Sequence, residues 1–364
     1  MDSEGRYYYS SIYPNESINV TLANKIVGAI YIGIPLFCLV PYLACLWVIF
    51  TDKHLRRQPT YIIIYHIGIA DVLQLVTDGI ISGIFTLSGT TWNYYLNKSV
   101  GAFLNIGWIV YTVLAHVLAF NRYVWLCRPQ WREKIFSQRK TECIMYACWA
   151  YGLIWFISYF TPNIDMVFNV YERSWNYFTL KYDSYVCWLL ELIQDTFHCA
   201  ASIVWYALSF WKIRTQAALI SAEEIREHRN EVRLLIQAFL ICVMIFLTLI
   251  GFFLIPQFPR ELYWTGPIAN FIWLLCCANN CFIYLLFNKL LRERVFTMFR
   301  NVKLKLIEHT PCHKRRAIRL LRNSTEGSTE LSRRDLGRYS AINPCCKRLP
   351  AGPTSSLLTY TEDL

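Results

Sequence analysis

Seven long apolar stretches alternate with shorter polar segments along the chain. Each stretch has about 20 residues or more, which is the length that a helix needs to cross the hydrocarbon core of a membrane. The pattern therefore predicts an all-α membrane protein, a bundle of seven transmembrane helices. The stretches are Ile26–Phe50, Pro59–Leu87, Val100–Trp125, Thr141–Phe160, Ser184–Trp211, Leu234–Leu254 and Pro267–Phe287.

Composition and charge agree with this prediction and orient the bundle. Hydrophobic residues make up 55% of the 364 residues, with 13 Trp, 24 Tyr and 22 Phe. Lys and Arg gather in every second gap between the stretches and in the segment after Phe287. Because basic loops stay in the cytoplasm, we expect the N-terminus outside and the C-terminus inside, in the plasma membrane or a sensory membrane. The net charge of +11 then favours membrane lipids rather than nucleic acid as a partner.

The chain divides into four predicted regions. Residues 1–25 form a polar extracellular segment, 26–287 the seven-helix bundle, 288–300 a short amphipathic eighth helix, and 301–364 a cytoplasmic, mostly disordered tail. Asn15 and Asn19 begin N-x-S/T sequons in the first region and are candidate glycosylation sites. We expect no cleavable signal peptide, because the first stretch is too long to be a signal h-region.

The 14 cysteines lie mostly inside the apolar stretches. Cys187 alone approaches the outer face, without a second outer cysteine to pair with, so no extracellular disulfide is expected. Cys312, Cys345 and Cys346 in the basic tail are candidate palmitoylation sites, and unmodified thiols remain the alternative. The sequence contains no metal-ligand set, nucleophile motif or phosphate-cradling loop. We therefore expect no enzyme, no catalytic residue, no metal and no cofactor.

Polar residues within three of the stretches recur at helical spacing, so each set lies on one helix face. Since charges at membrane depth are costly, these faces should point into the bundle and enclose a polar cavity. The three sets are Asp71, Gln74 and Asp78 in the second stretch; Glu191, Gln194, Asp195 and His198 in the fifth; and Asn270, Trp273, Cys277, Asn280 and Tyr284 in the seventh.

Two roles are open for these side chains. One is interhelical hydrogen bonding alone, which we favour for Asn270 and Gln74. The other is an outward-facing ligand pocket, which is favoured for the carboxylates because a buried carboxylate needs a partner. The ligand pocket candidates are Asp78, Trp108, Tyr111, Glu191, Gln194, Asp195 and His198, with a charged His198–Asp195 pair as one arrangement.

Short motifs at the ends of the stretches resemble those of rhodopsin-like G-protein-coupled receptors. Asn121-Arg122-Tyr123 is similar to the Asp-Arg-Tyr signature at the inner end of the third helix. Asn280-Cys281-Phe282-Ile283-Tyr284 resembles Asn-Pro-x-x-Tyr, and Asp71 stands where that family keeps a buried acid. The resemblance implies a coupling gate at Asn121, Arg122 and Tyr123 and an activation switch at Asp71, Asn280 and Tyr284. It covers residues 26–300 and includes an eighth helix after the seventh span.

The sequence departs from that family at several positions, and these differences narrow the group of receptors that it resembles. Asn97 lies where the family usually has a cysteine bonded to the second extracellular loop, and the sixth stretch lacks Cys-Trp-x-Pro. Asn121 in place of the acid removes one restraint on Arg122. This divergent pattern is similar to nematode serpentine chemoreceptors of class T or X. It implies a small-molecule or peptide ligand and a heterotrimeric G protein as partners.

The tail adds one further candidate partner. A cluster of hydroxyl residues, if phosphorylated, would suit an arrestin-like regulator. The rival function for the whole chain is a transporter or ion channel that uses the intramembrane carboxylates as a relay. The absence of an internal repeat favours the receptor. The hydroxyl residues are Ser324, Thr325, Ser328, Thr329 and Ser332.

Overall fold

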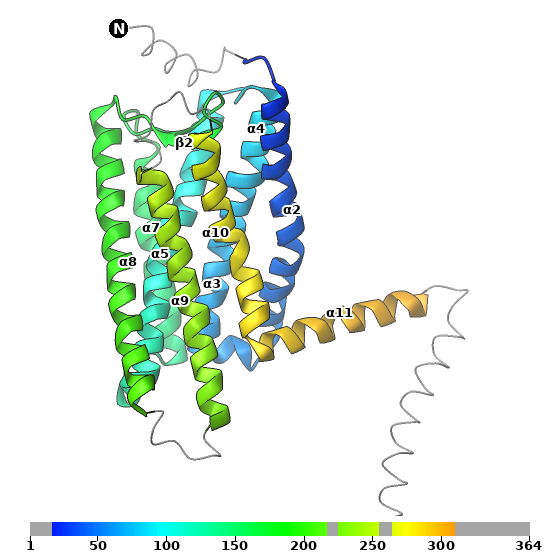
Figure 1. Cartoon of the computed structure of the whole chain (residues 1–364), viewed down its shortest axis with the longest axis vertical. Helices are drawn as coiled ribbons and strands as arrows, with labels where there is room; N and C mark the ends of the chain where they lie inside the picture. The colour runs from blue at the N-terminus through cyan, green and yellow to red at the C-terminus, as the bar shows by residue number, and fades with distance from the viewer. Residues whose placement is uncertain (1–16, 217–224, 255–263, 310–364) are drawn as a thin grey trace, which may run out of the picture. The chain divides into compact units, whose positions relative to one another are not determined.

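A computed structural model describes residues 17–216, 225–254 and 264–309. Residues 1–298 form one compact unit, in which seven long helical segments run side by side (Figure 1). The second segment is continuous but changes type, from α3 through a π-helical stretch to α4. The segments are α2 (Leu22–Thr51), α3 (Pro59–Gln74) with η2 (Leu75–Ile81) and α4 (Ser82–Ser88), α5 (Tyr94–Cys127), α7 (Gln138–Ser158), α8 (Tyr182–Gln216), α9 (Ile225–Leu254) and α10 (Thr265–Phe287).

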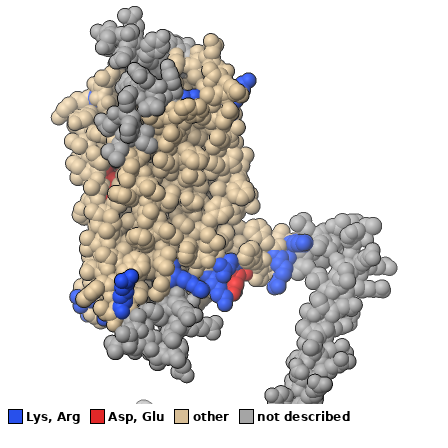
Figure 2. Space-filling view, in the orientation of Figure 1, with Lys and Arg blue, Asp and Glu red and all other residues tan. Residues whose placement is uncertain are grey.

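The outer surface of the bundle suits lipid. Large apolar side chains point outward, such as Phe37 on α2, which is 71% exposed, and Ile154 on α7, which is 67% exposed. Lys and Arg are scarce on the side of the helices drawn in Figure 2. By length and composition alone, α2, the α3–α4 segment, α5, α9 and α10 could each span a membrane. Helices α7 and α8 are the other two of the seven long helical segments.

A small hairpin crosses one end of the bundle, at the upper side of Figure 1. Its strands β1 (Met166–Asn169) and β2 (Ser174–Tyr177) pair antiparallel, with Met166 opposite Tyr177. Strand β1 packs on α5 and β2 packs on α10. The backbone comes so close to α5 that a Cβ on Gly101 would lie 2.1 Å from the Met166 carbonyl oxygen. We call this end of the bundle the hairpin end. The sequence pattern did not predict the hairpin.

The opposite end of the bundle, called the arginine end because Arg122 lies there, carries three short helical turns and the start of α11. The turns are η1 (Leu55–Arg57), η3 (Pro129–Trp131) and α6 (Arg132–Ile135). Helix α11 spans Lys289–His309, where the sequence predicts an amphipathic helix over 288–300. Asn288 Oδ1 accepts a bond from the Leu291 amide at 3.0 Å, and Leu291 and Val295 are buried. That α11 lies along a membrane stays a prediction.

The polar faces of the second and seventh segments meet, as their spacing predicts. Asp71 Oδ2 accepts a hydrogen bond from Asn280 Nδ2 at 2.8 Å, and Gln74 Oε1 accepts one from Trp273 Nε1 at 2.8 Å. Above them Asp78 is adjacent to Asn270, although neither Asp78 oxygen makes a hydrogen bond of normal geometry. The π-helical stretch keeps Asp78 on the buried side, and the Ser82 hydroxyl donates to the Thr77 carbonyl five residues back at 3.1 Å.

Candidate functional site

The hairpin is attached to α5 by a buried amide. Asn97 Oδ1 accepts from the Phe168 N–H at 2.8 Å, and Asn97 Nδ2 donates to the Phe168 carbonyl at 3.0 Å. Both bonds are buried, so they act where water cannot compete. Asn97 therefore holds β1 without a covalent link, and Cys187, the outer cysteine, is a free thiol.

A buried carboxylate, Asp165, provides a second attachment. Its oxygens contact Lys98 Nζ at 2.7 Å and Lys181 Nζ at 2.6 Å, and the Tyr94 hydroxyl donates to it at 2.5 Å. Burial raises the pKa of Asp165, but the hydrogen bonds from Lys181, Lys98 and Tyr94 outweigh this effect and leave its pKa below the usual value. These contacts join the start of β1 to α5 and α8.

Glu191 of α8 lies directly beneath the hairpin. Its Oε2 accepts hydrogen bonds from the Tyr177 hydroxyl of β2 and, at 3.1 Å, from Asn105 Nδ2 of α5. Tyr177 in turn contacts the Tyr159 hydroxyl at the end of α7. Glu191 thus connects the hairpin with three helices, and it is 7% exposed. The sequence analysis missed Tyr177 because loop contacts carry no periodic signal, and it missed Asn105 because this residue of α5 contacts that loop residue and a distant helix.

Asp195, one turn further along α8, starts a chain of contacts across the bundle. Its Oδ2 accepts from Trp108 Nε1 at 2.7 Å. The Trp108 ring packs edge-on against Trp273 with centroids 5.3 Å apart, and Trp273 donates to Gln74. Phe252 of α9 also packs edge-on against Trp273, at 4.8 Å between centroids. Residues from five segments, α3, α5, α8, α9 and α10, therefore meet around one aromatic pair.

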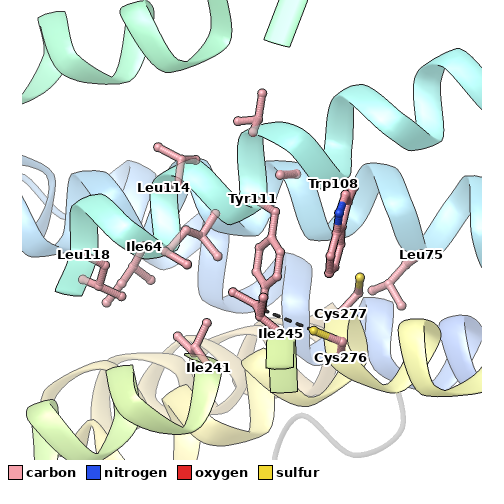
Figure 3. Packing of buried hydrophobic residues seen from close by; sticks show 14 of the residues in the cluster. Ile64, Leu75, Trp108, Tyr111, Leu114, Leu118, Ile241, Ile245, Cys276 and Cys277 are labelled. Carbon is pink, nitrogen blue, oxygen red and sulfur yellow. Dashed lines mark hydrogen bonds between the residues drawn. The ribbon is translucent and has the colours of Figure 1, made fainter. Parts of the chain in front are cut away.

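Of the remaining predicted pocket residues, Gln194 contacts Asp195, whereas Tyr111 and His198 contact other parts of the bundle. Tyr111 lies deeper, where its hydroxyl contacts Cys276 Sγ at 3.5 Å (Figure 3). Gln194 contacts the Tyr151 hydroxyl and, at 3.3 Å, Asp195 Oδ1. His198 faces away from Asp195: its Nδ1 lies 2.8 Å from His116 Nδ1, so the suggested His198–Asp195 pair is not formed.

All the predicted carboxylates of the pocket are buried, and one of them, Glu191, contacts the hairpin. Asp78, Asp195, Trp108 and Tyr111 are each less than 5% exposed. That these residues line an outward-facing ligand pocket stays a prediction. Among the described residues, Glu191 and Asp195 belong to a buried polar layer beneath the hairpin.

The predicted activation switch centres on Asp71. Asn280 Nδ2 donates to Asp71 Oδ2 at 2.8 Å, and its contact with the Tyr111 hydroxyl spans 3.1 Å. The Tyr42 hydroxyl of α2 also donates to Asp71, a partner that the sequence analysis missed. Tyr284 does not bond Asp71 in this structure; its ring packs edge-on against Tyr42 at 6.5 Å. Figure 3 shows Tyr111 and Trp108 of α5 pointing toward Cys276 and Cys277 of α10.

The predicted gate lies at the arginine end. Arg122 is 3% exposed, and its guanidinium donates to the Thr60 hydroxyl of α3 and to Asn121 Oδ1. The Thr60 hydroxyl lies 3.1 Å from Asn121 Oδ1, so two of the acceptors of the arginine also contact each other. Tyr123 packs on Trp205 of α8 with centroids 4.9 Å apart. Thr60 gave no signal in the sequence because hydroxyl residues are common inside helices.

The modification candidates fall largely outside the described residues. Asn15, Cys312, Cys345 and Cys346 lie there. Asn19 is described and exposed, so its side chain is accessible to modification. All these modifications stay predictions.

Seven membrane helices, a hairpin across one end and a buried arginine at the other define a rhodopsin-like receptor fold. The chain is similar to the crystal structure of squid rhodopsin, with a TM-score of 0.62 at 16% identity over 80% of this chain and 92% of that chain. No curated protein sequence matches it. The family model described as serpentine type 7TM GPCR chemoreceptor Srt matches residues 4–308. The chain therefore belongs to the Srt serpentine chemoreceptor family, which confirms the resemblance to such receptors.

Proposed function

We propose that this multi-pass membrane protein is a chemosensory receptor that binds a small extracellular ligand and activates a heterotrimeric G protein. Ligand binding beneath the hairpin biases an equilibrium between a closed and an open arginine end. The N-terminus is extracellular and the C-terminus cytoplasmic, because Lys and Arg gather at the arginine end and in the tail. The location is the plasma membrane, and membrane lipids and an arrestin-like regulator are further partners.

The observation that carries this proposal is the position of Arg122. A guanidinium buried in a membrane bundle is costly, and here Thr60 and Asn121 hold it. Hydrogen bonds from the guanidinium to a hydroxyl and to an amide oxygen exchange for other acceptors when the helices move apart. Opening of α3, α5 and α9 would release Arg122 to a G protein. Asn121, Arg122 and Tyr123 form the gate in this proposal, and Asp71, Asn280 and Tyr284 form the switch.

Replacing Arg122 by alanine should abolish coupling and leave the bundle folded. We expect ligand-dependent or constitutive guanine-nucleotide exchange to fall at least about tenfold, equivalent to roughly 1.4 kcal/mol or more of coupling free energy. The measurement is exchange on a G protein in cells that express equal amounts of each receptor at their surface. Arg128→Ala is the matched control, because Arg128 is exposed at the same end. Exchange that survives Arg122→Ala unchanged would remove Arg122 from the gate.

The transporter or channel alternative has less support. A relay needs acidic groups along the whole crossing path. Among the described residues, the buried acids inside the bundle are Asp71, Asp78, Glu191 and Asp195, and none lies between Asp71 and Arg122 along the helices. Ion current or substrate uptake without nucleotide exchange would nevertheless favour this alternative.

A further inference from the structure

We propose that the ligand of this receptor is an organic cation, which Glu191 and Asp195 of α8 recognise together with the aromatic pair Trp108 and Trp273. This inference rests on the receptor function proposed above and adds the chemical class of the ligand.

The first argument is the charge of the layer beneath the hairpin. Glu191 and Asp195 lie one helical turn apart and are 7% and 1% exposed. Neither Glu191 nor Asp195 forms an ion pair with the described residues, whereas Asp165 contacts two lysines. A buried carboxylate without a cation keeps its charge only at a considerable cost in free energy, which a cation from outside would remove. A cationic ligand supplies the missing charge.

The second argument is an acceptor without a donor. Asn105 is fully buried, and its Nδ2 donates to Glu191 Oε2 at 3.1 Å. The Oδ1 atom of the same amide has no hydrogen-bond partner. Because buried polar atoms are nearly always bonded, this oxygen indicates a donor that arrives from elsewhere. An ammonium group beside Glu191 would bring N–H donors to the amide oxygen and positive charge to the carboxylate.

The third argument is the aromatic surface beside Asp195. Trp108 donates to Asp195 through its ring nitrogen and packs edge-on against Trp273, whose other neighbour is Phe252. Aromatic rings close to an anion favour an organic cation, since the quadrupole of the ring attracts positive charge. An alcohol would satisfy the Asn105 oxygen but neither the carboxylates nor the rings. An apolar odorant would satisfy none of the polar groups.

Charge-matched compounds test this proposal directly. Full-length receptor in lipid nanodiscs is titrated with primary and quaternary amines, each paired with the alcohol of the same carbon skeleton, beginning with phenethylamine and 2-phenylethanol. Binding is read as a rise in melting temperature. We expect amines to bind in preference to their alcohols, and the double variant Glu191→Gln, Asp195→Asn to lose tenfold or more in apparent affinity. The control Asp183→Asn changes an exposed acid on the first turn of α8 and should bind normally.

Two results would overturn the cation class: alcohols that bind as well as their amines, or amine binding that survives in the double variant. If no compound binds, the melting temperature of the ligand-free double variant decides. An equal or higher value supports the proposal, because two unpaired acids have been neutralised. A lower value would show that the carboxylates serve the fold and would overturn it.

The same experiment separates this inference from the proposed function. Nucleotide exchange driven by an uncharged ligand would reject the ligand class and keep the receptor function. An amine that binds through Glu191 and Asp195 without any nucleotide exchange would keep the ligand class and reject the receptor function.

Discussion

The Asp165→Ala variant is expected to lose much of the stability of the hairpin end. The change leaves Lys98 Nζ, whose side chain is 8% exposed, without the carboxylate that lies 2.7 Å away. Removal of one partner of a buried ion pair costs about 3–5 kcal/mol, because the remaining charge stays uncompensated. Lys181, with 27% side-chain exposure, adds less, since water screens its charge.

Thermal unfolding of the purified receptor measures this loss. Asp183→Ala is the matched control, since Asp183 is an exposed acid near the same end of α8. If both variants melt at the same temperature, the Asp165 contacts do not hold the hairpin.

The wild-type protein should also lose this contribution in acid. The pKa of Asp165 is lower in the folded protein than its value of about 3.9 in an unfolded chain. The stability that Asp165 contributes is therefore fully present above about pH 4 and is lost as the pH falls through the folded pKa. The melting temperature of the wild type should fall in that range, and the Asp165→Ala variant should lack this part of the fall.

Replacing Asn97 by leucine should also detach the hairpin. The leucine side chain has a similar shape but leaves the Phe168 N–H and carbonyl, both bonded to Asn97, without partners in a buried site. Each unsatisfied buried group costs about 1–3 kcal/mol, so we expect roughly 2–6 kcal/mol in total. Ligand binding should weaken with stability, because β2 also carries Tyr177 onto Glu191.

The control for this variant is Tyr95→Leu, which changes an exposed residue, 75% accessible, on the same turn of α5. Hydrogen exchange at the Phe168 amide provides a local measurement. Fast exchange there in Asn97→Leu, with normal protection in Tyr95→Leu, would locate the effect at this attachment. Unchanged protection would contradict it.

Much of the fold could be predicted from local sequence, because membrane helices depend on length and apolarity alone. The alternation of apolar and basic segments predicted seven spans, and all seven helical segments are present among the described residues. The spacing of Asp71 and Gln74 placed them on the face that meets α10, where they contact Asn280 and Trp273. Helical periodicity thus identified which side chains point inward.

Other features of the candidate site could not be found in this way. The partners of the predicted residues come from distant parts of the chain: Tyr42 for Asp71, Thr60 for Arg122 and Tyr177 for Glu191. Such contacts depend on how helices rotate and on how a loop returns, and neither has a period in the sequence. The same reason explains the missing His198–Asp195 pair, since both residues lie on one helix but face different neighbours.

The sequence by itself determined that this protein crosses the membrane seven times and which polar faces turn inward. Those properties follow from short-range spacing and from the cost of placing polar groups in lipid. Only the tertiary structure decided that a hairpin crosses one end of the bundle, that Asn97 and Asp165 attach it through hydrogen bonds and ion pairs, and that Glu191 and Asp195 lie buried. These depend on contacts between segments far apart in the chain, whose free energy is set by packing in three dimensions.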